Sequence, residues 1–194
     1  MLNASGDVLV GTDLALVRGG RLLFESVSFR VARGDALLVT GPNGAGKSSL
    51  LRLVAGLLEP AGGTLANPFF IGWQAGEPAL KPDRLLGSEL AYWAALDAAP
   101  PAAVQGAAVA MAIDSLLDLP CAMLSAGQRQ RAALARVIAS GAPLWLLDEP
   151  TNALDAASEI RLLRAIASHR EQGGLVVAAT HHALPVPGAA HLSL

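Results

Sequence analysis

The stretch that decides the fold covers residues 41–48 and is Gly41-Pro42-Asn43-Gly44-Ala45-Gly46-Lys47-Ser48. It matches the phosphate-binding pattern G-x-x-x-x-G-K-[ST] at every fixed position. A strand-like apolar run, residues 36–40, precedes it, and a helix-like run, residues 48–55, follows it. A glycine-rich turn that binds nothing is the alternative, but a strand before the loop and a helix after it favour a nucleoside-triphosphate site.

Each residue type in this loop has a physical task. Gly41, Gly44 and Gly46 allow backbone angles that side chains forbid, so successive N–H groups can point at an anion. The helix that begins there adds the positive end of its dipole. We expect Lys47 to reach the β- and γ-phosphates and the Ser48 hydroxyl to bind Mg²⁺. A nucleoside triphosphate with Mg²⁺ is the predicted ligand.

Composition bounds the remaining possibilities. The 194 residues suffice for one compact domain, and the net charge of −2 gives no general attraction to nucleic acid. No uninterrupted apolar run approaches the length of about 18 residues that spans a bilayer. A single cysteine excludes an internal disulfide framework. The first residues, 1–7, lack the layout of a signal peptide, which predicts a cytosolic location.

Strand and helix patterns alternate along the chain, which predicts an α/β sheet with its ligand at the carboxyl ends of parallel strands. The predicted strands are residues 8–17, 22–32, 36–40, 69–73, 144–147, 175–179 and 190–194. The predicted helices are residues 48–55, 84–118 with a break at Pro100-Pro101, 126–140 and 156–171. No internal repeat is present.

Two carboxylates, Asp148 and Glu149, end the buried apolar run 144–147. A carboxylate in that position is costly unless it is paired or near a metal. We expect Asp148 to hold Mg²⁺, directly or through water, and Glu149 to accept a proton from an attacking water. The alternative is an acid pair that caps a helix before Pro150.

A third element, Leu124-Ser125-Ala126-Gly127-Gln128, precedes an Arg- and Ala-rich helix. Ser125 is the predicted N-cap, and the small residues Ala126 and Gly127 would leave N–H groups of the first turn open to an anion. An ordinary N-cap without a ligand is the alternative.

Taken together, these motifs resemble the ABC-family ATPases, the nucleotide-binding subunits of ATP-driven transporters. On this resemblance the phosphate loop is Gly41–Ser48 with Ser49, the signature is Leu124–Gln128, and Asp148-Glu149 form the magnesium and base pair. The Q-loop glutamine is Gln74, the D-loop aspartate Asp155 and the switch histidine His181. These elements occur in the family's order over nearly the whole chain.

The resemblance implies a P-loop NTPase fold: one ABC ATPase domain over residues 1–194, with a mainly parallel central sheet, an N-terminal antiparallel β subdomain and a helical subdomain at residues 75–140. It implies ATP hydrolysis with Glu149, His181, Gln74 and Lys47 as catalytic residues and Ser48, Gln74 and Asp148 at Mg²⁺. Two copies would enclose ATP, with Ser125, Gly127, Gln128 and Asp155 contributed across the dimer. An integral membrane subunit would be the other partner, with the chain peripheral on the cytoplasmic face of the inner membrane.

Two positions depart from the family pattern. Ala126 replaces a glycine in the signature, and the added methyl is small. The aromatic residue that stacks on adenine is missing, and Arg18 occupies the region instead. A guanidinium plane can stack on a base, and an exposed arginine without a ligand is the alternative.

Local phrases are most similar to the subfamily that serves haem export in cytochrome c maturation. They include Ile71-Gly72-Trp73-Gln74-Ala75-Gly76 and Ala179-Thr180-His181-His182. This resemblance implies a CcmB-like membrane subunit as the partner. The ATPase of another ABC exporter is the first alternative, and a soluble ABC ATPase acting on ribosomes or DNA is a second. Cys121, His169 and His191 are interpreted as structural residues and His182 as a surface residue, none of them a haem ligand.

Overall fold

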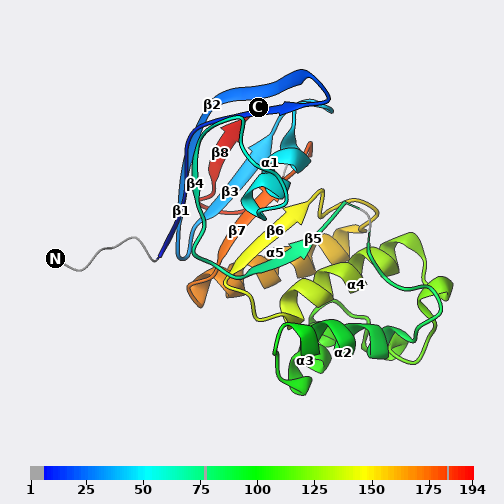
Figure 1. Ribbon diagram of the computed structural model, residues 1–194. Coiled ribbons are helices and arrows are strands. Elements are labelled where there is room, and N and C mark those ends of the chain that lie inside the picture. Colours follow the sequence, from blue (N-terminus) through cyan, green and yellow to red (C-terminus); the bar gives the residue numbers. More distant parts are fainter. Residues whose placement is uncertain (1–6, 77, 183) are drawn as a thin grey trace.

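The computed structural model describes residues 7–76, 78–182 and 184–194. Residues 1–6, which make up most of the segment without a signal-peptide layout, lie outside the described residues. The described residues form two sheets and five α-helices, with the antiparallel sheet at one end and the helices α2, α3 and α4 at the other (Figure 1).

Three strands form the antiparallel sheet, in the order β2-β1-β4. β1 (Val8–Arg18) and β2 (Arg21–Ala32) form a hairpin around Gly19 and Gly20, whose positive φ angles of 58° and 76° suit glycine. This confirms the predicted strands and their turn. β4 (Gly62–Ala66) was not predicted, and it pairs antiparallel with β1.

Five parallel strands form the central sheet, in the order β5-β6-β7-β3-β8. Their bounds are β5 Ile71–Gln74, β6 Leu144–Asp148, β7 Leu175–Ala179, β3 Ala36–Thr40 and β8 Ala190–Ser193. Every residue of β6 and β7 is buried, as the continuous apolar runs predicted. Because the strands are parallel, the phosphate loop after β3 and Asp148 at the end of β6 reach the same edge of the sheet.

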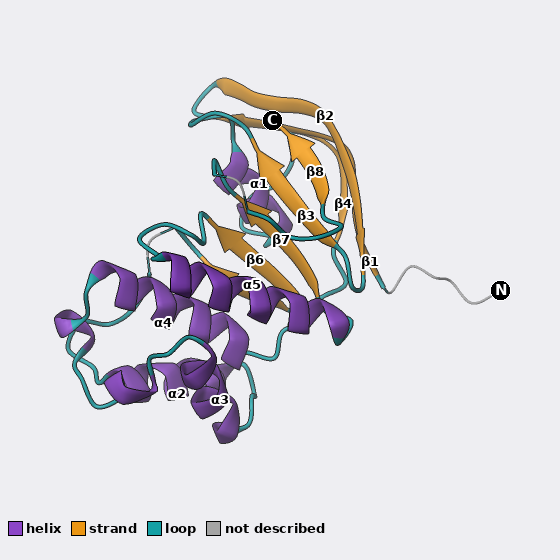
Figure 2. Ribbon diagram, turned by 180° about the vertical axis from the view of Figure 1, so that it is seen from behind, coloured by secondary structure: helices purple, strands orange, loops and turns teal. Residues whose placement is uncertain are grey.

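The helices cover the two faces of the central sheet (Figure 2). They are α1 Lys47–Val54, α2 Leu86–Leu96, α3 Pro101–Ala110, α4 Ala126–Ala139 and α5 Ala156–Glu171, with two short 3₁₀ turns, η2 Asp114–Leu116 and η3 Cys121–Met123. Pro101 occupies the first turn of α3, where its missing N–H costs no hydrogen bond. The predicted break at Pro100-Pro101 is therefore confirmed, but the predicted helix ends at Ala110 rather than at residue 118.

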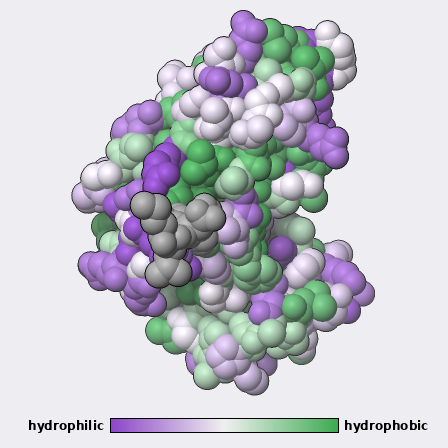
Figure 3. All heavy atoms as spheres, turned by 60° about the vertical axis from the view of Figure 1, so that its left-hand side comes forward, coloured by the Kyte–Doolittle hydropathy of each residue, from purple (hydrophilic) through white to green (hydrophobic). Residues whose placement is uncertain are grey.

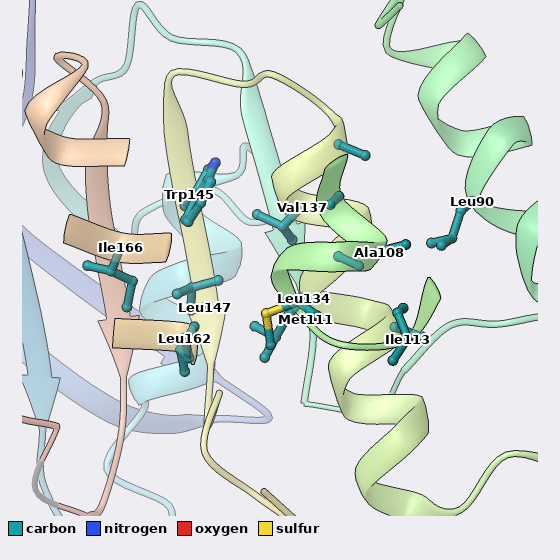
Figure 4. Packing of buried hydrophobic residues seen from close by; sticks show 14 of the residues in the cluster. Leu90, Ala108, Met111, Ile113, Leu134, Val137, Trp145, Leu147, Leu162 and Ile166 are labelled. Carbon is teal, nitrogen blue, oxygen red and sulfur yellow. The ribbon is translucent and has the colours of Figure 1, made fainter. Parts of the chain in front are cut away.

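Alternate residues of β6 enter two different hydrophobic cores. Leu144 and Leu146 pack with α1 and the antiparallel sheet, whereas Trp145 and Leu147 pack with the helices on the other face. Figure 4 shows the second core, in which Leu147 lies between α5 and α4. This two-sided burial fixes β6 firmly and with it the carboxylates at its end.

The outer surface mixes hydrophobic and hydrophilic residues on the face shown in Figure 3. Among the described residues, every helix is too short or too polar to cross a bilayer.

Candidate active site

The phosphate loop has the backbone that its glycines predicted. Gly41, Gly44 and Gly46 have φ angles of 143°, 84° and 106°. Gly46 is the N-cap of α1 and makes no side-chain capping bond, so the first N–H groups of the helix remain available to an anion. A Cβ atom at Gly41 would lie 2.7 Å from the backbone oxygen of Leu194, which leaves no room for a side chain.

The side chain of Lys47 bonds to the backbone at the start of the phosphate loop. Its Nζ donates to the backbone oxygens of Gly41 at 2.8 Å and Pro42 at 3.3 Å, and lies 3.8 Å from Glu149 Oε1. The side chain is only 7% exposed. The ammonium therefore lies inside the loop, where its charge favours an anionic ligand.

Ser48 and Asp148 are one hundred residues apart in the chain, but their side chains are hydrogen-bonded in the structure. Ser48 Oγ donates to Asp148 Oδ1 at 2.9 Å. Burial and the neighbouring charge of Glu149 raise the pKa of the Asp148 carboxyl, and together they outweigh the Ser48 hydrogen bond and the charges of Arg52 and Lys47, which lower it. Because ionising this buried carboxyl is costly without a nearby cation, the position suits a residue that binds one.

Glu149 is held by three groups at the carboxyl edge of the sheet. Its Oε2 accepts from the backbone N–H of His181 at 3.2 Å and lies 2.7 Å from His181 Nδ1, and its own N–H donates to Ala179 at 2.8 Å. Its φ of 50° is unusual for a residue with a side chain. Such strain at a strand end is common where a side chain must be aimed at a ligand.

Gln74 ends β5, next to β6, and is 1% exposed. Its Nε2 donates to the backbone oxygen of Ala75. Its Oε1 has no hydrogen-bond partner among the described residues. The following backbone passes close to the carboxylates, since a Cβ atom at Gly76 would lie 3.7 Å from Asp148 Oδ2.

A cavity of about 480 Å³ opens over the phosphate loop. Arg18 and Leu23 from the antiparallel hairpin line it together with Glu149. The phosphate-loop residues that line it are Asn43, Gly44, Gly46, Lys47, Ser48 and Ser49. The structure thus brings Arg18 beside the loop, although only sequence position suggested it.

The signature segment lies elsewhere. Residues 124–128 are not part of the lining of this cavity. Ser125 is the N-cap of α4, as predicted, and the structure adds a capping box: Gln128 N donates to Ser125 Oγ at 3.2 Å, and Ser125 N donates to Gln128 Oε1 at 2.8 Å. The spacing Ser-x-x-Gln is the sequence signal for this box.

Asp155 and Gly127 are explained by contacts within the chain. Asp155 caps α5, with Ser158 N donating to Oδ1 at 2.8 Å, and the side chain and backbone of Ser158 together lower the pKa of the carboxyl. A Cβ atom at Gly127 would lie 2.7 Å from the backbone oxygen of Ala153. Gly127 therefore allows the signature helix and the segment before Asp155 to pack closely.

Sequence reasoning missed Gln130, a buried residue of α4. Its Nε2 donates to the backbone oxygen of Pro150 at 2.9 Å and so fixes the turn after Glu149. A glutamine one turn into an amphipathic helix carries no sequence signal for this contact.

Of the residues interpreted as structural, Cys121 and His169 are packed against neighbouring residues, whereas His191 is exposed. Cys121 is 2% exposed in the hydrophobic core, and burial raises the pKa of its thiol. His169 stacks on Trp145, His182 is exposed, and His191 is an exposed residue of β8.

Comparison with protein families matches residues 24–152 to the ABC transporter family. The cytochrome c biogenesis ATP-binding export protein CcmA of Sphingopyxis alaskensis is 52% identical over 93% of this chain and 93% of its own. The protein of the same name from Rhodospirillum rubrum is 49% identical over 96% of this chain and 85% of its own.

Solved structures agree on the fold. The ATP-binding subunit of an ABC transporter superposes with a TM-score of 0.82 at 24% identity, over 90% of this chain and 79% of that chain. A bacterial Atm1-family ABC exporter with ATP bound gives a TM-score of 0.84 at 24% identity, over all of this chain and 37% of that chain.

Proposed function

The chain belongs to the ABC transporter family as an ATP-hydrolysing subunit, and on that premise we propose that it powers haem export or release in cytochrome c maturation. The observation that carries this proposal is its identity of about one half, over most of both chains, to proteins named for cytochrome c biogenesis and export. Cytochromes c carry covalently attached haem, so haem is the proposed cargo.

For ATP, the backbone N–H groups after Gly41 and at the start of α1 bind the phosphates, and Lys47 neutralises their charge. The open N-cap at Gly46 and the position of Lys47 inside the loop support these roles. The loop residues in contact with the phosphates are Gly41, Pro42, Asn43, Gly44, Ala45, Gly46, Lys47, Ser48 and Ser49.

Ser48, Asp148 and Gln74 provide oxygen ligands for Mg²⁺. The bonded pair Ser48–Asp148 and the unpartnered Gln74 Oε1 fit a hard cation that prefers oxygen donors. The cation, when bound, neutralises negative charge on the phosphates.

Glu149 accepts the proton of the attacking water. The carboxylate is oriented by His181, and its Oε1 lies 3.8 Å from Lys47 Nζ. Deprotonated, it can take one proton as the water oxygen attacks the γ-phosphorus; the bond to the β,γ-bridging oxygen breaks, and ADP keeps that oxygen.

Two copies enclose the nucleotide between them. Each phosphate loop is completed by Ser125, Gly127, Gln128 and Asp155 from the other copy. The location of the signature segment outside the cavity of its own phosphate loop supports this arrangement. The γ-phosphate then joins both copies, and its loss on hydrolysis weakens the interface.

A CcmB-like membrane subunit is the second partner, and the chain binds it at the cytoplasmic face of the inner membrane. The helical subdomain at residues 75–140 transmits the change, because Gln74 precedes it directly and lies at the active-site edge. Arg18 contacts the base of ATP, since it lines the cavity on the side of the hairpin.

The test uses a strain of Sphingopyxis alaskensis that lacks its own CcmA and expresses this chain. We expect covalent haem attachment to periplasmic cytochromes c, measured by haem staining, to be restored by the chain and lost with Lys47→Ala. Glu171→Gln, an exposed change on α5, is the matched control. Restoration by Lys47→Ala, or failure of the unchanged chain despite normal expression and ATPase activity, would contradict the haem function.

A further inference from the structure

A second cavity, of about 560 Å³, lies on the side of the central sheet that α3, α4 and α5 cover. It shares no lining residue with the cavity over the phosphate loop. Trp145, near the start of β6, lies in its wall, whereas Asp148 and Glu149 lie at the other end of that strand. Its volume is in the range of small-molecule sites, about 300–1,000 Å³.

The wall of this cavity is apolar on one side. Val109 and Ala110 of α3 and Ile138 of α4 contribute there, and Val109 is 54% exposed. Exposed aliphatic surface inside a concavity favours the apolar body of a ligand, because binding removes that surface from water.

The opposite side carries positive charge without a partner. Arg161 and Arg164 of α5 line the cavity, and no carboxylate of the described residues lies within ion-pair distance of either. No acidic side chain is among the residues of the lining. Two guanidinium groups one helical turn apart suit a carboxylate or another oxyanion.

Aromatic rings close the inner wall. The Trp145 indole stacks on the His169 imidazole, with centroids 3.9 Å apart and planes 8° apart. Burial lowers the pKa of His169, so the imidazole is neutral at neutral pH and the cationic charge belongs to the arginines. Trp145 Nε1 has no acceptor among the described residues, and in Figure 4 it is on the side of the ring away from Leu147.

We propose that this cavity is a binding site for a small amphipathic anion, a molecule with an apolar body and a carboxylate or similar oxyanion. The apolar body lies against Val109, Ile138 and the Trp145–His169 stack, and the anionic group lies between Arg161 and Arg164. The site is separate from the nucleotide site and does not depend on the identity of the transported cargo.

The experiment uses the purified chain with two probes: 1-anilinonaphthalene-8-sulfonate, which combines an aromatic body with a sulfonate, and decanoate as its competitor. We expect saturable one-site binding of the fluorescent probe, displaced by decanoate and unaffected by ATP with Mg²⁺. Arg161→Gln with Arg164→Gln should weaken both probes about tenfold, as expected for the loss of two partly exposed ionic contacts.

Two further variants distinguish this site from general adhesion of the probe. Ala165→Leu places a larger side chain in the lining and should weaken binding with both arginines present. Arg30→Gln, an exposed arginine of β2, is the matched control and should bind as the unchanged chain does. Unsaturable binding, an equal loss in the control, or no loss in the double arginine variant that still hydrolyses ATP would overturn the proposal.

Discussion

The phosphate loop and the signature segment both precede the N-terminus of a helix, yet they satisfy their polar groups in different ways. Lys47 bonds to Gly41 and Pro42 within the loop, and Ser48 bonds to Asp148, so the loop is anchored to the end of β6. The side chains of Ser125 and Gln128 each accept the backbone N–H of the other residue, in a capping box. The N-cap of α1 is open, whereas that of α4 is already occupied.

This difference indicates that the phosphate loop is arranged to bind a ligand, whereas the signature segment is arranged to contact a partner. The phosphate loop offers an anion free N–H groups and a buried ammonium. The signature segment is a helix start with its own capping groups, in which Ser125 and Ala126 are exposed. A segment of that kind can be presented to another copy without rearrangement, which supports the proposed dimer.

The largest expected effect follows from Glu149→Gln. The amide cannot accept a proton from water, so ATP turnover should fall at least about a hundredfold while ATP binding persists. The retained γ-phosphate should then hold two chains together, which size-exclusion chromatography with and without ATP would detect. Glu171→Gln should remain monomeric and active under the same conditions. Undiminished turnover in Glu149→Gln would exclude the base role.

Mixing two inactive variants tests the comparison directly. Ser125→Arg blocks a signature and Lys47→Ala disables a phosphate loop, so neither homodimer should hydrolyse ATP. A mixed dimer contains one site with an intact loop from one chain and an intact signature from the other. In a steady-state ATPase assay, we therefore expect the mixed dimer to recover at most half of the activity of a dimer of unchanged chains. Full activity, or none at any mixing ratio, would contradict a shared site.

Asp148→Asn should stabilise the nucleotide-free protein. Because the pKa of Asp148 is raised in the folded state, the unfolded chain releases this proton first as pH rises, and the free energy of unfolding decreases. Asparagine removes that cost at neutral pH and can still accept the Ser48 hydrogen bond. We expect a higher Tm at pH 7, where 1 kcal/mol corresponds to about 2–4 °C.

The pH dependence of the Tm difference between Asp148→Asn and the unchanged chain tests this explanation. The gain in Tm should shrink as pH falls toward about 3.9, the ordinary pKa of aspartate, where both states bind the proton. Asp118→Asn, an exposed change, should leave Tm unaltered at each pH. A lower Tm for Asp148→Asn at pH 7 would show that its ionised form stabilises the apo protein.

Local patterns predicted most of the fold because periodicity and capping act over short distances. β3 and α5 have the predicted bounds, and the N-caps Ser125 and Asp155 explain where α4 and α5 begin. β4 was missed because Gly-Gly-Thr-Leu-Ala has little strand preference, and its pairing with β1 supplies the stabilisation.

The burial of Glu89 and the contacts between distant residues were beyond prediction from local patterns. Glu89 is fully buried on an Ala-rich helix, where Trp93 Nε1 donates to it at 2.9 Å and Arg84 forms an ion pair with it at 3.4 Å. The pairs Gln130–Pro150 and Trp145–His169 likewise depend on how elements pack. The motifs identified the nucleotide site, but packing determines which side chains support it.

Arg18→Ala should have the smallest effect and extends the comparison from the phosphates to the base. Arg18 lines the phosphate-loop cavity from the end of β1, in the region where an aromatic residue was missing. If its guanidinium plane stacks on adenine, the variant should bind ATP about two- to fivefold more weakly, as expected for 0.5–1 kcal/mol at an exposed site. Its affinity for inorganic triphosphate should change less, because that ligand has no base.

The hairpin supplies a matched control for this measurement. Arg21 pairs with Arg18 across the turn and is exposed, but it does not line the cavity. Arg21→Ala should therefore leave both affinities unchanged in isothermal titration calorimetry. Equal weakening of ATP and triphosphate by Arg18→Ala would mean that Arg18 binds phosphate, and the phosphate-binding region would then extend from residues 41–49 to the hairpin.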